Sequence, residues 1–335
     1  MTDGGSRAPR MLASVAFVVL LVLFARHVDW RAAAAAARNA DAGLLVLALV
    51  LNQISLVVKG VRWWVFLRAV GVRSLRLVLR ATYAGASLNN LVVAQGGEGA
   101  RVLIVSRTSG VAASRVTSAL ALERALDAVS YLTLLVGGAF TLDLPEMLAR
   151  WRIEAALALA CAVVALLLLG ATSRARGEST AGVDTMWARM AGGLARFASS
   201  VSETASPPRL AMGMALSLAA WALQVATYHT VALAAHLPIS LAGSIAAMLA
   251  IGISFIIRGT PGNVGIFQVI YAMTAASFGV AKPAAVATAL LIQAVQIIPT
   301  VLLGTLAAHH LAVGRGSHAP VTRGAGAPTT DPPGS

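Results

Sequence analysis

Long apolar runs, separated by short polar or basic stretches, fill most of the chain. They cover about residues 11–25, 43–67, 116–142, 155–171, 210–235, 240–257, 266–280 and 283–311. Most approach the roughly 20 residues that a membrane-spanning helix needs. The apolar residues are continuous, whereas those of a membrane β-strand would alternate with polar ones. The pattern therefore predicts an all-α, polytopic integral membrane protein with about seven or eight transmembrane helices.

Composition supports this class. Apolar residues make up 58% of the 335-residue chain and charged residues only 12%, whereas about 45–50% and about 25% are usual in soluble proteins. Aromatic residues are only 5%, which leaves little for the aromatic girdles of an outer-membrane barrel. We therefore expect helical spans.

The net charge of +13, from 26 Lys and Arg against 13 Asp and Glu, would suggest a nucleic-acid partner in a soluble protein. Here the basic residues lie in short loops, where they favour the cytoplasmic side and anionic lipid. We therefore expect no nucleic-acid partner. Between Lys59 and Arg80 six basic residues occur without an acid, which predicts that this loop and the N-terminus are cytoplasmic.

The predicted organisation has three parts. Residues 1–10 form a cytoplasmic N-terminus, 11–311 a transmembrane domain with a cytoplasmic loop at 172–209, and 312–335 a disordered tail rich in Gly, Pro, Ser and Thr. The first apolar run is expected to be a signal anchor, with a cleaved signal peptide as the alternative. Residues 186–201 have the apolar spacing of an amphipathic helix on the membrane surface.

Two segments interrupt the apolar pattern, one in each half of the chain. Gln95–Arg101 follows a stretch, Ala81–Ala94, that is too short for a comfortable span and fits a re-entrant helix. Arg258–Gly265 contains Pro261, Gly262 and Gly265 between two apolar runs. One broken or re-entrant segment per half is typical of transporters built from internal repeats, with the binding site at the breaks. Residue identity alone does not demonstrate a repeat, and a plain surface loop is the alternative for the second segment.

Three ionisable residues lie inside the run 116–142, in the string LERALD: Glu123, Arg124 and Asp127. A rise of about 1.5 Å per residue puts Glu123 about 10 Å and Asp127 about 16 Å into a core roughly 30 Å thick. Carboxylates at that depth cost about 2.5–3.5 kcal/mol each even on a lenient scale. Either they face a polar cavity on a transport path, or they form an ion-pair clamp between helices.

The string QGGEGAR contains Glu98 and Arg101 just after the glycines. A helix starting there would offer free amide groups and a positive dipole to an anionic head group, with Arg101 pairing to a phosphate. The alternative is that Glu98 and Arg101 pair with each other. Arg124 and Arg258 are further candidates to contact the head group.

Motifs for other chemistries are missing from the sequence. It contains no P-loop, no HExxH, no nucleophile elbow and no Cys/His cluster, and Cys161 is the single cysteine. We therefore expect no enzyme activity, no cofactor and no metal site.

The order of four motifs, RWW (Arg62–Trp64), GGEGAR, LERALD and TPGNVGIF, resembles the bacterial flippase-like family. This family comprises the transmembrane region of lysylphosphatidylglycerol synthases and its stand-alone relatives. The resemblance implies that the protein moves a lipid, commonly an aminoacylated phospholipid, between leaflets. Site residues that match the family motifs are Glu98, Arg101, Glu123, Arg124, Asp127, Pro261, Gly262 and Gly265.

Asn263 and Gln268 depart from the pattern, where the family tends to have Gly and Glu. The chain also lacks the soluble aminoacyl-transfer domain, so we do not expect it to make lysylphosphatidylglycerol.

The resulting hypothesis is a lipid translocase for an anionic or aminoacylated phospholipid or a lipid-linked substrate. In it, arginines contact an anionic head group while carboxylates orient them or bind a cationic group. The alternative is a membrane scaffold or partner subunit of a separate lipid- or glycan-modifying enzyme, with the charges serving helix packing. A membrane enzyme ranks third, since no nucleophile or cofactor motif accompanies the carboxylates.

Overall fold

The computed structural model describes residues 34–35, 38–91, 96–141, 150–172, 204–254 and 263–316, and within these ranges all regular structure is helical. The elements are α3 (Ala42–Leu67), η1 (Arg68–Val70), α4 (Leu75–Leu91), α5 (Gly96–Ser109), α6 (Ala113–Thr141), α8 (Arg152–Thr172), α10 (Pro207–Ala234), α11 (Leu241–Ser254), α12 (Ile266–Ala276) and α13 (Lys282–Gly316). The all-helical class is confirmed. The apolar run at 11–25, the amphipathic segment at 186–201 and the tail beyond residue 316 lie outside the described residues.

Three helices of the described chain are long and apolar enough to cross a membrane: Ala42–Val70, Pro207–Ala234 and Lys282–Leu311. Two shorter apolar helices are Leu241–Gly252 and Ile266–Ala276. Helix α6 is long, at 29 residues, but it carries the charges of LERALD. The membrane-embedded class follows from these helices, and the total of seven or eight spans stays a prediction.

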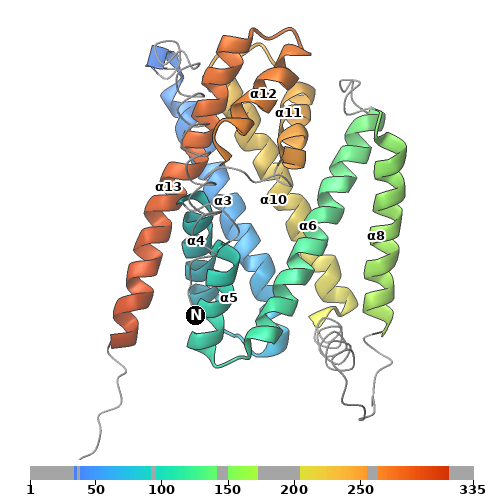
Figure 1. Cartoon of the computed structure of the whole chain (residues 1–335), viewed down its shortest axis with the longest axis vertical. Helices are drawn as coiled ribbons and strands as arrows, with labels where there is room; N and C mark the ends of the chain where they lie inside the picture. Colours follow the sequence, from blue (N-terminus) through green and yellow to red (C-terminus); the bar gives the residue numbers. More distant parts are fainter. Residues whose placement is uncertain are drawn as a thin grey trace, which may run out of the picture.

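The helices form two sets with the same order of lengths. Helices α3, α4, α5 and α6 have 26, 17, 14 and 29 residues, and α10, α11, α12 and α13 have 28, 14, 11 and 35. Figure 1 shows the sets running in opposite directions: α3 descends and α6 ascends, while α10 ascends and α13 descends. This is the arrangement expected of an inverted repeat.

Each set contains a short helical hairpin. In Figure 1 the α4–α5 hairpin occupies the lower half of the bundle and the α11–α12 hairpin the upper half. Most of the interrupted segment predicted at Gln95–Arg101 lies in the first turns of α5. Residues 92–95 and 255–262, which include most of the segment predicted at Arg258–Gly265, lie outside the described residues. Helix α4 begins at Leu75, earlier than the predicted short segment, because the apolar residues Leu77 and Val78 already pack in the core.

Glycines set how closely α4 approaches its neighbours. A Cβ on Gly97 would lie 2.0 Å from the carbonyl oxygen of Gly85, and one on Gly304 would lie 2.4 Å from that of Tyr83. Helix α4 therefore packs backbone against backbone with both α5 and α13, as small residues permit between membrane helices.

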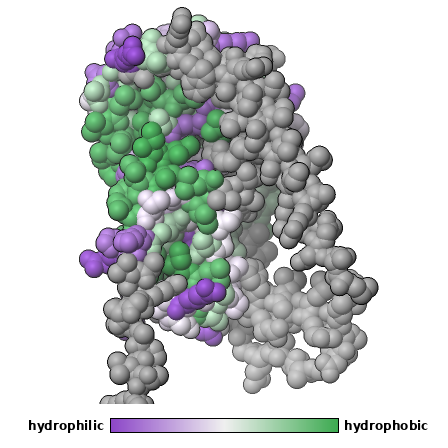
Figure 2. Space-filling model, turned by 60° about the vertical axis from the view of Figure 1, so that its left-hand side comes forward, coloured by the Kyte–Doolittle hydropathy of each residue, from purple (hydrophilic) through white to green (hydrophobic). Residues whose placement is uncertain are grey.

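The outer surface is apolar over much of the bundle. Figure 2 shows a broad hydrophobic face with hydrophilic residues at its upper edge and in its lower part. Helices α3 and α13 contribute exposed side chains, among them Val46, Leu47, Ile298, Leu302 and Leu306. Such a surface is expected where lipid is the solvent.

Candidate functional site

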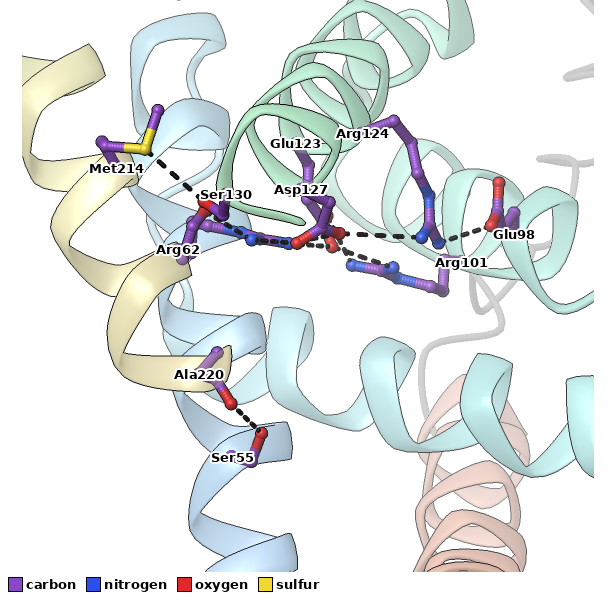
Figure 3. Close-up of polar contacts among 11 residues, drawn as sticks. Ser55, Arg62, Glu98, Arg101, Glu123, Arg124, Asp127, Ser130, Met214 and Ala220 are labelled. Carbon is purple, nitrogen blue, oxygen red and sulfur yellow. Dashed lines mark hydrogen bonds and ion pairs between the residues drawn. The ribbon is translucent and has the colours of Figure 1, made fainter. Parts of the chain in front are cut away.

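Six charged side chains from three helices meet inside the lower half of the bundle (Figure 3). We call this group the ionic network. Its members are Arg62 on α3, Glu98 and Arg101 on α5, and Glu123, Arg124 and Asp127 on α6.

Arg62 is the centre of the ionic network and is fully buried. Its Nη1 donates to Asp127 Oδ1 at 2.5 Å and to Ser217 Oγ at 2.6 Å. Its Nη2 donates to Asp127 Oδ2 at 3.0 Å and to Glu123 Oε1 at 3.1 Å. The fork of donors thus binds Asp127 through both carboxylate oxygens, a geometry that arginine provides and lysine does not.

Arg101 completes the coordination of Glu123. Its Nη2 donates to Glu123 Oε2 at 2.9 Å, and its guanidinium carbon lies 4.2 Å from the centre of a Trp63 ring. The indole of Trp63, itself fully buried, therefore supports the arginine by a cation–π contact. Both oxygens of Glu123 are taken by arginines.

The opposite end of the ionic network is accessible. Arg124 pairs with Glu98 on α5 and lies 3.7 Å from Asp127 Oδ2. Arg124 is 45% exposed, compared with 18% for Glu98 and 20% for Asp127. The exposure of the ionic network therefore increases from Arg62, which is fully buried, to Arg124. We call these the sealed end and the open end, because a charged group could reach Arg124 from outside the protein.

The structure brings together all five charged residues that the sequence analysis singled out in GGEGAR and LERALD: Glu98, Arg101, Glu123, Arg124 and Asp127. It also decides how they pair. The alternative that Glu98 pairs with Arg101 is wrong, because Glu98 contacts Arg124 while Arg101 contacts Glu123. Glu98 lies in the first turn of α5, where the helix dipole favours a carboxylate.

Arg62 was missed as a site residue. The sequence placed it in a basic loop, together with Lys59, as a topology signal. Both residues lie instead within α3, and Arg62 is buried because it balances two carboxylates. Its position in RWW, between apolar residues and only a turn before the end of the run 43–67, was the available signal.

Gly265 lies apart from the ionic network, next to α12. It has a φ of 93°, a backbone conformation that glycine adopts readily, and its N–H donates to Gln268 Oε1 at 2.7 Å. Gln268 in turn donates to Gln293 of α13, and both side chains are buried. Arg258, Pro261 and Gly262 lie outside the described residues.

The Gln268–Gln293 pair of the second helix set corresponds in position to the Arg101–Glu123 pair of the first. Both pairs join the second short helix of the set to its last long helix. The first pair is charged and the second is neutral, so the two halves differ in chemistry. Among the described residues, no group of three or more His, Cys, Asp or Glu could bind a metal.

The fold and the ionic network define a helical membrane protein with a buried charged site that opens at one end. The profile of the family named "lysylphosphatidylglycerol synthase TM region" matches residues 11–304. The chain belongs to this family, and the resemblance seen in its motifs is confirmed. A comparison with curated proteins finds no match.

Proposed function

We propose that this protein is a translocase that moves a phospholipid or lipid-linked head group between the leaflets of the bacterial plasma membrane. The observation that carries the proposal is the graded ionic network, which is sealed at Arg62 and 45% exposed at Arg124. Ionisable groups inside a membrane domain are costly and most often mark a substrate or ion path. Acyl chains would remain in lipid while the head group passes the network.

The open end suits a head group that carries a phosphate. Arg124 offers a guanidinium fork whose present partner, Glu98, lies on the neighbouring helix and is replaceable by a phosphate. Glu98, once released, is available to an ammonium group such as that of an aminoacylated or ethanolamine head group.

The proposed orientation places the lower end of Figure 1 in the cytoplasm. The helix ends and connections there carry an excess of arginine within the described chain: Arg68, Arg73, Arg76, Arg80, Arg107, Arg115 and Arg209. Short loops rich in Lys and Arg stay on the cytoplasmic side. The N-terminus is proposed to lie on the same side, and the protein is proposed to act as a transporter without enzyme activity, cofactor or nucleic-acid partner.

Arg124→Ala is expected to lower the rate of lipid movement by about 10- to 100-fold, the effect of losing a charged hydrogen bond to the head group. Folding should be preserved, because exposed ion pairs contribute only about 0.2–1 kcal/mol. The measurement is the movement of fluorescent phosphatidylglycerol, phosphatidylcholine and lysylphosphatidylglycerol in proteoliposomes. Asp127→Ala should abolish movement, and size-exclusion chromatography of the same sample checks that this variant is folded.

The matched control is Arg107→Ala, an exposed arginine on α5 that makes no ion pair in the described structure. It should move lipid at the wild-type rate. Full activity of an Arg124→Ala, Asp127→Ala double variant would refute the proposed site. Inactivity of the folded wild type toward every head group would refute transport by the isolated protein.

A scaffold or partner subunit for a separate lipid-modifying enzyme is the second candidate. The observation that favours it is that three arginines and three carboxylates of the ionic network are mutually paired, as in a clamp between helices. Stoichiometric co-purification of such an enzyme, without lipid movement by either protein alone, would support this candidate.

A further inference from the structure

A groove between α4 and α13 opens on the surface of the bundle, away from the side chains of the ionic network. It has a volume of about 480 Å³ and is lined by Leu75, Arg76, Leu79, Arg80, Tyr83, Leu303 and Ala307. We call it the α4–α13 groove. Its volume falls in the range of sites that bind small molecules or parts of larger ones.

The walls of the groove follow from how the two helices cross. Gly304 brings α13 against the backbone of α4 at Tyr83. The groove lies between the start of α4 and the end of α13. On α4 its wall is formed by Leu75, Leu79 and Tyr83, each about one turn from the next, and on α13 by Leu303 and Ala307. Leu303 is 42% exposed, so the groove adjoins the surface that faces lipid.

Charge and apolar surface occur together in this groove. Arg76 and Arg80 are four residues apart on α4 and therefore project on the same side. Arg76 is exposed and Arg80 half-buried, and neither makes an ion pair within the described part of the chain. The residues that line the groove include no acid. The arginine pair is thus a cationic site beside an apolar wall.

We propose that the α4–α13 groove binds an anionic glycerophospholipid of the surrounding leaflet. The phosphate would lie on Arg76 and Arg80, with one acyl chain along Leu79 and Leu303. The chemistry favours this occupant because its negative head group and apolar tail complement both parts of the groove. The site is distinct from the ionic network, and the proposal does not depend on lipid transport.

The test is a titration of the purified protein in detergent with dioleoylphosphatidylglycerol or dioleoylphosphatidylcholine, with bound lipid counted by native mass spectrometry. We expect wild type to retain phosphatidylglycerol in preference to phosphatidylcholine. An Arg76→Gln, Arg80→Gln double variant should lose one bound phosphatidylglycerol, with affinity reduced by about 30-fold if each arginine near the surface contributes as basic residues commonly do.

Two matched variants separate the groove from nonspecific attraction. Arg107→Gln with Arg115→Gln removes two exposed arginines from the same end of the bundle and should leave the bound lipid unchanged. Ala307→Phe fills the groove while keeping both arginines, and should reduce binding as well. Retention of the lipid in Ala307→Phe, or an equal loss in the control pair, would overturn the proposal.

Arg124→Ala distinguishes this site from the proposed translocation site. The groove lipid should persist in that variant even if lipid movement is lost. Loss of the groove lipid in Arg124→Ala, with retention in the Arg76, Arg80 variant, would assign the bound lipid to the ionic network and refute the groove.

Discussion

Arg62→Ala is expected to destabilise the protein by about 3–5 kcal/mol, the cost of leaving buried charges without their partner. Arg62 is fully buried and contacts Asp127, Glu123 and Ser217. Without Arg62, Asp127 loses both of the hydrogen bonds that it accepts from this arginine. Glu123 keeps only the ion pair with Arg101. The measurement is the temperature at which half the protein still elutes as a folded species after heating in detergent.

The matched comparison is Arg124→Ala, the exposed arginine of the same network, which should shift this midpoint only slightly. Neutralising Arg62 together with its bidentate partner should rescue the fold: Arg62→Met combined with Asp127→Asn is expected to recover much of the lost stability, because buried ion pairs are often replaceable as a unit and Glu123 stays paired with Arg101. A wild-type midpoint for Arg62→Ala would contradict the burial of this arginine.

The rescued double variant, Arg62→Met with Asp127→Asn, also separates the two functions considered for the ionic network. A clamp between helices requires only stability, so the double variant should then behave as wild type in every assay. A transport site requires the charges themselves. A stable double variant that moves no lipid would therefore favour the translocase over the scaffold.

Much of the fold could be predicted from the sequence, because apolar runs and charges report directly on membrane helices. The ranges 43–67 and 210–235 match α3 and α10 within a few residues. Helix ends were less predictable. Helix α13 continues to Gly316, past the expected boundary at 311, and no proline occurs between these positions to end it.

The site was predictable where charges fell inside apolar runs, and not where they fell at the edge. Glu123 and Asp127 stood out because nothing else explains carboxylates at that depth. Arg62 did not, because an arginine near the end of a span is usually a topology signal. The pairing was also beyond the sequence, since it depends on how α5 crosses α6.

The roles of the glycines at the start of α5 could not be predicted from the sequence. The string QGGEGA contains three glycines within four residues, which in a sequence indicates a helix break. In the structure, Gly96, Gly97 and Gly99 all lie in α5, and they differ in their surroundings. Gly97 contacts the backbone of α4, whereas a Cβ on Gly99 would meet no atom within 4 Å.

Gly97→Ala is therefore expected to disrupt the α4–α5 hairpin. The new Cβ would lie 2.0 Å from the carbonyl oxygen of Gly85 and 2.6 Å from Asn89 Oδ1, so the helices must separate. Overpacking of this kind typically costs about 1–3 kcal/mol, and a clash with backbone is harder to relieve than one with a side chain. We expect a lower yield of folded protein and a lower thermal midpoint on size-exclusion chromatography.

Gly99→Ala is the matched control, two residues along the same helix. It adds the same methyl group into open space and should leave the thermal midpoint unchanged or raise it. Helix propensity can add up to about 1 kcal/mol to the free energy of unfolding. Equal loss in both variants would show that the hairpin tolerates no alanine for a reason other than the Gly85 contact.

The displacement caused by Gly97→Ala should reach the ionic network through Arg101, which lies one turn further along α5 and pairs with Glu123 at 2.9 Å. If the strain acts by pulling this arginine away, part of the damage is the loss of that ion pair. The effects of Gly97→Ala and Glu123→Gln on stability would then be less than additive. Full additivity would mean that the hairpin and the ionic network fail independently, and that α4 positions α5 without positioning Arg101.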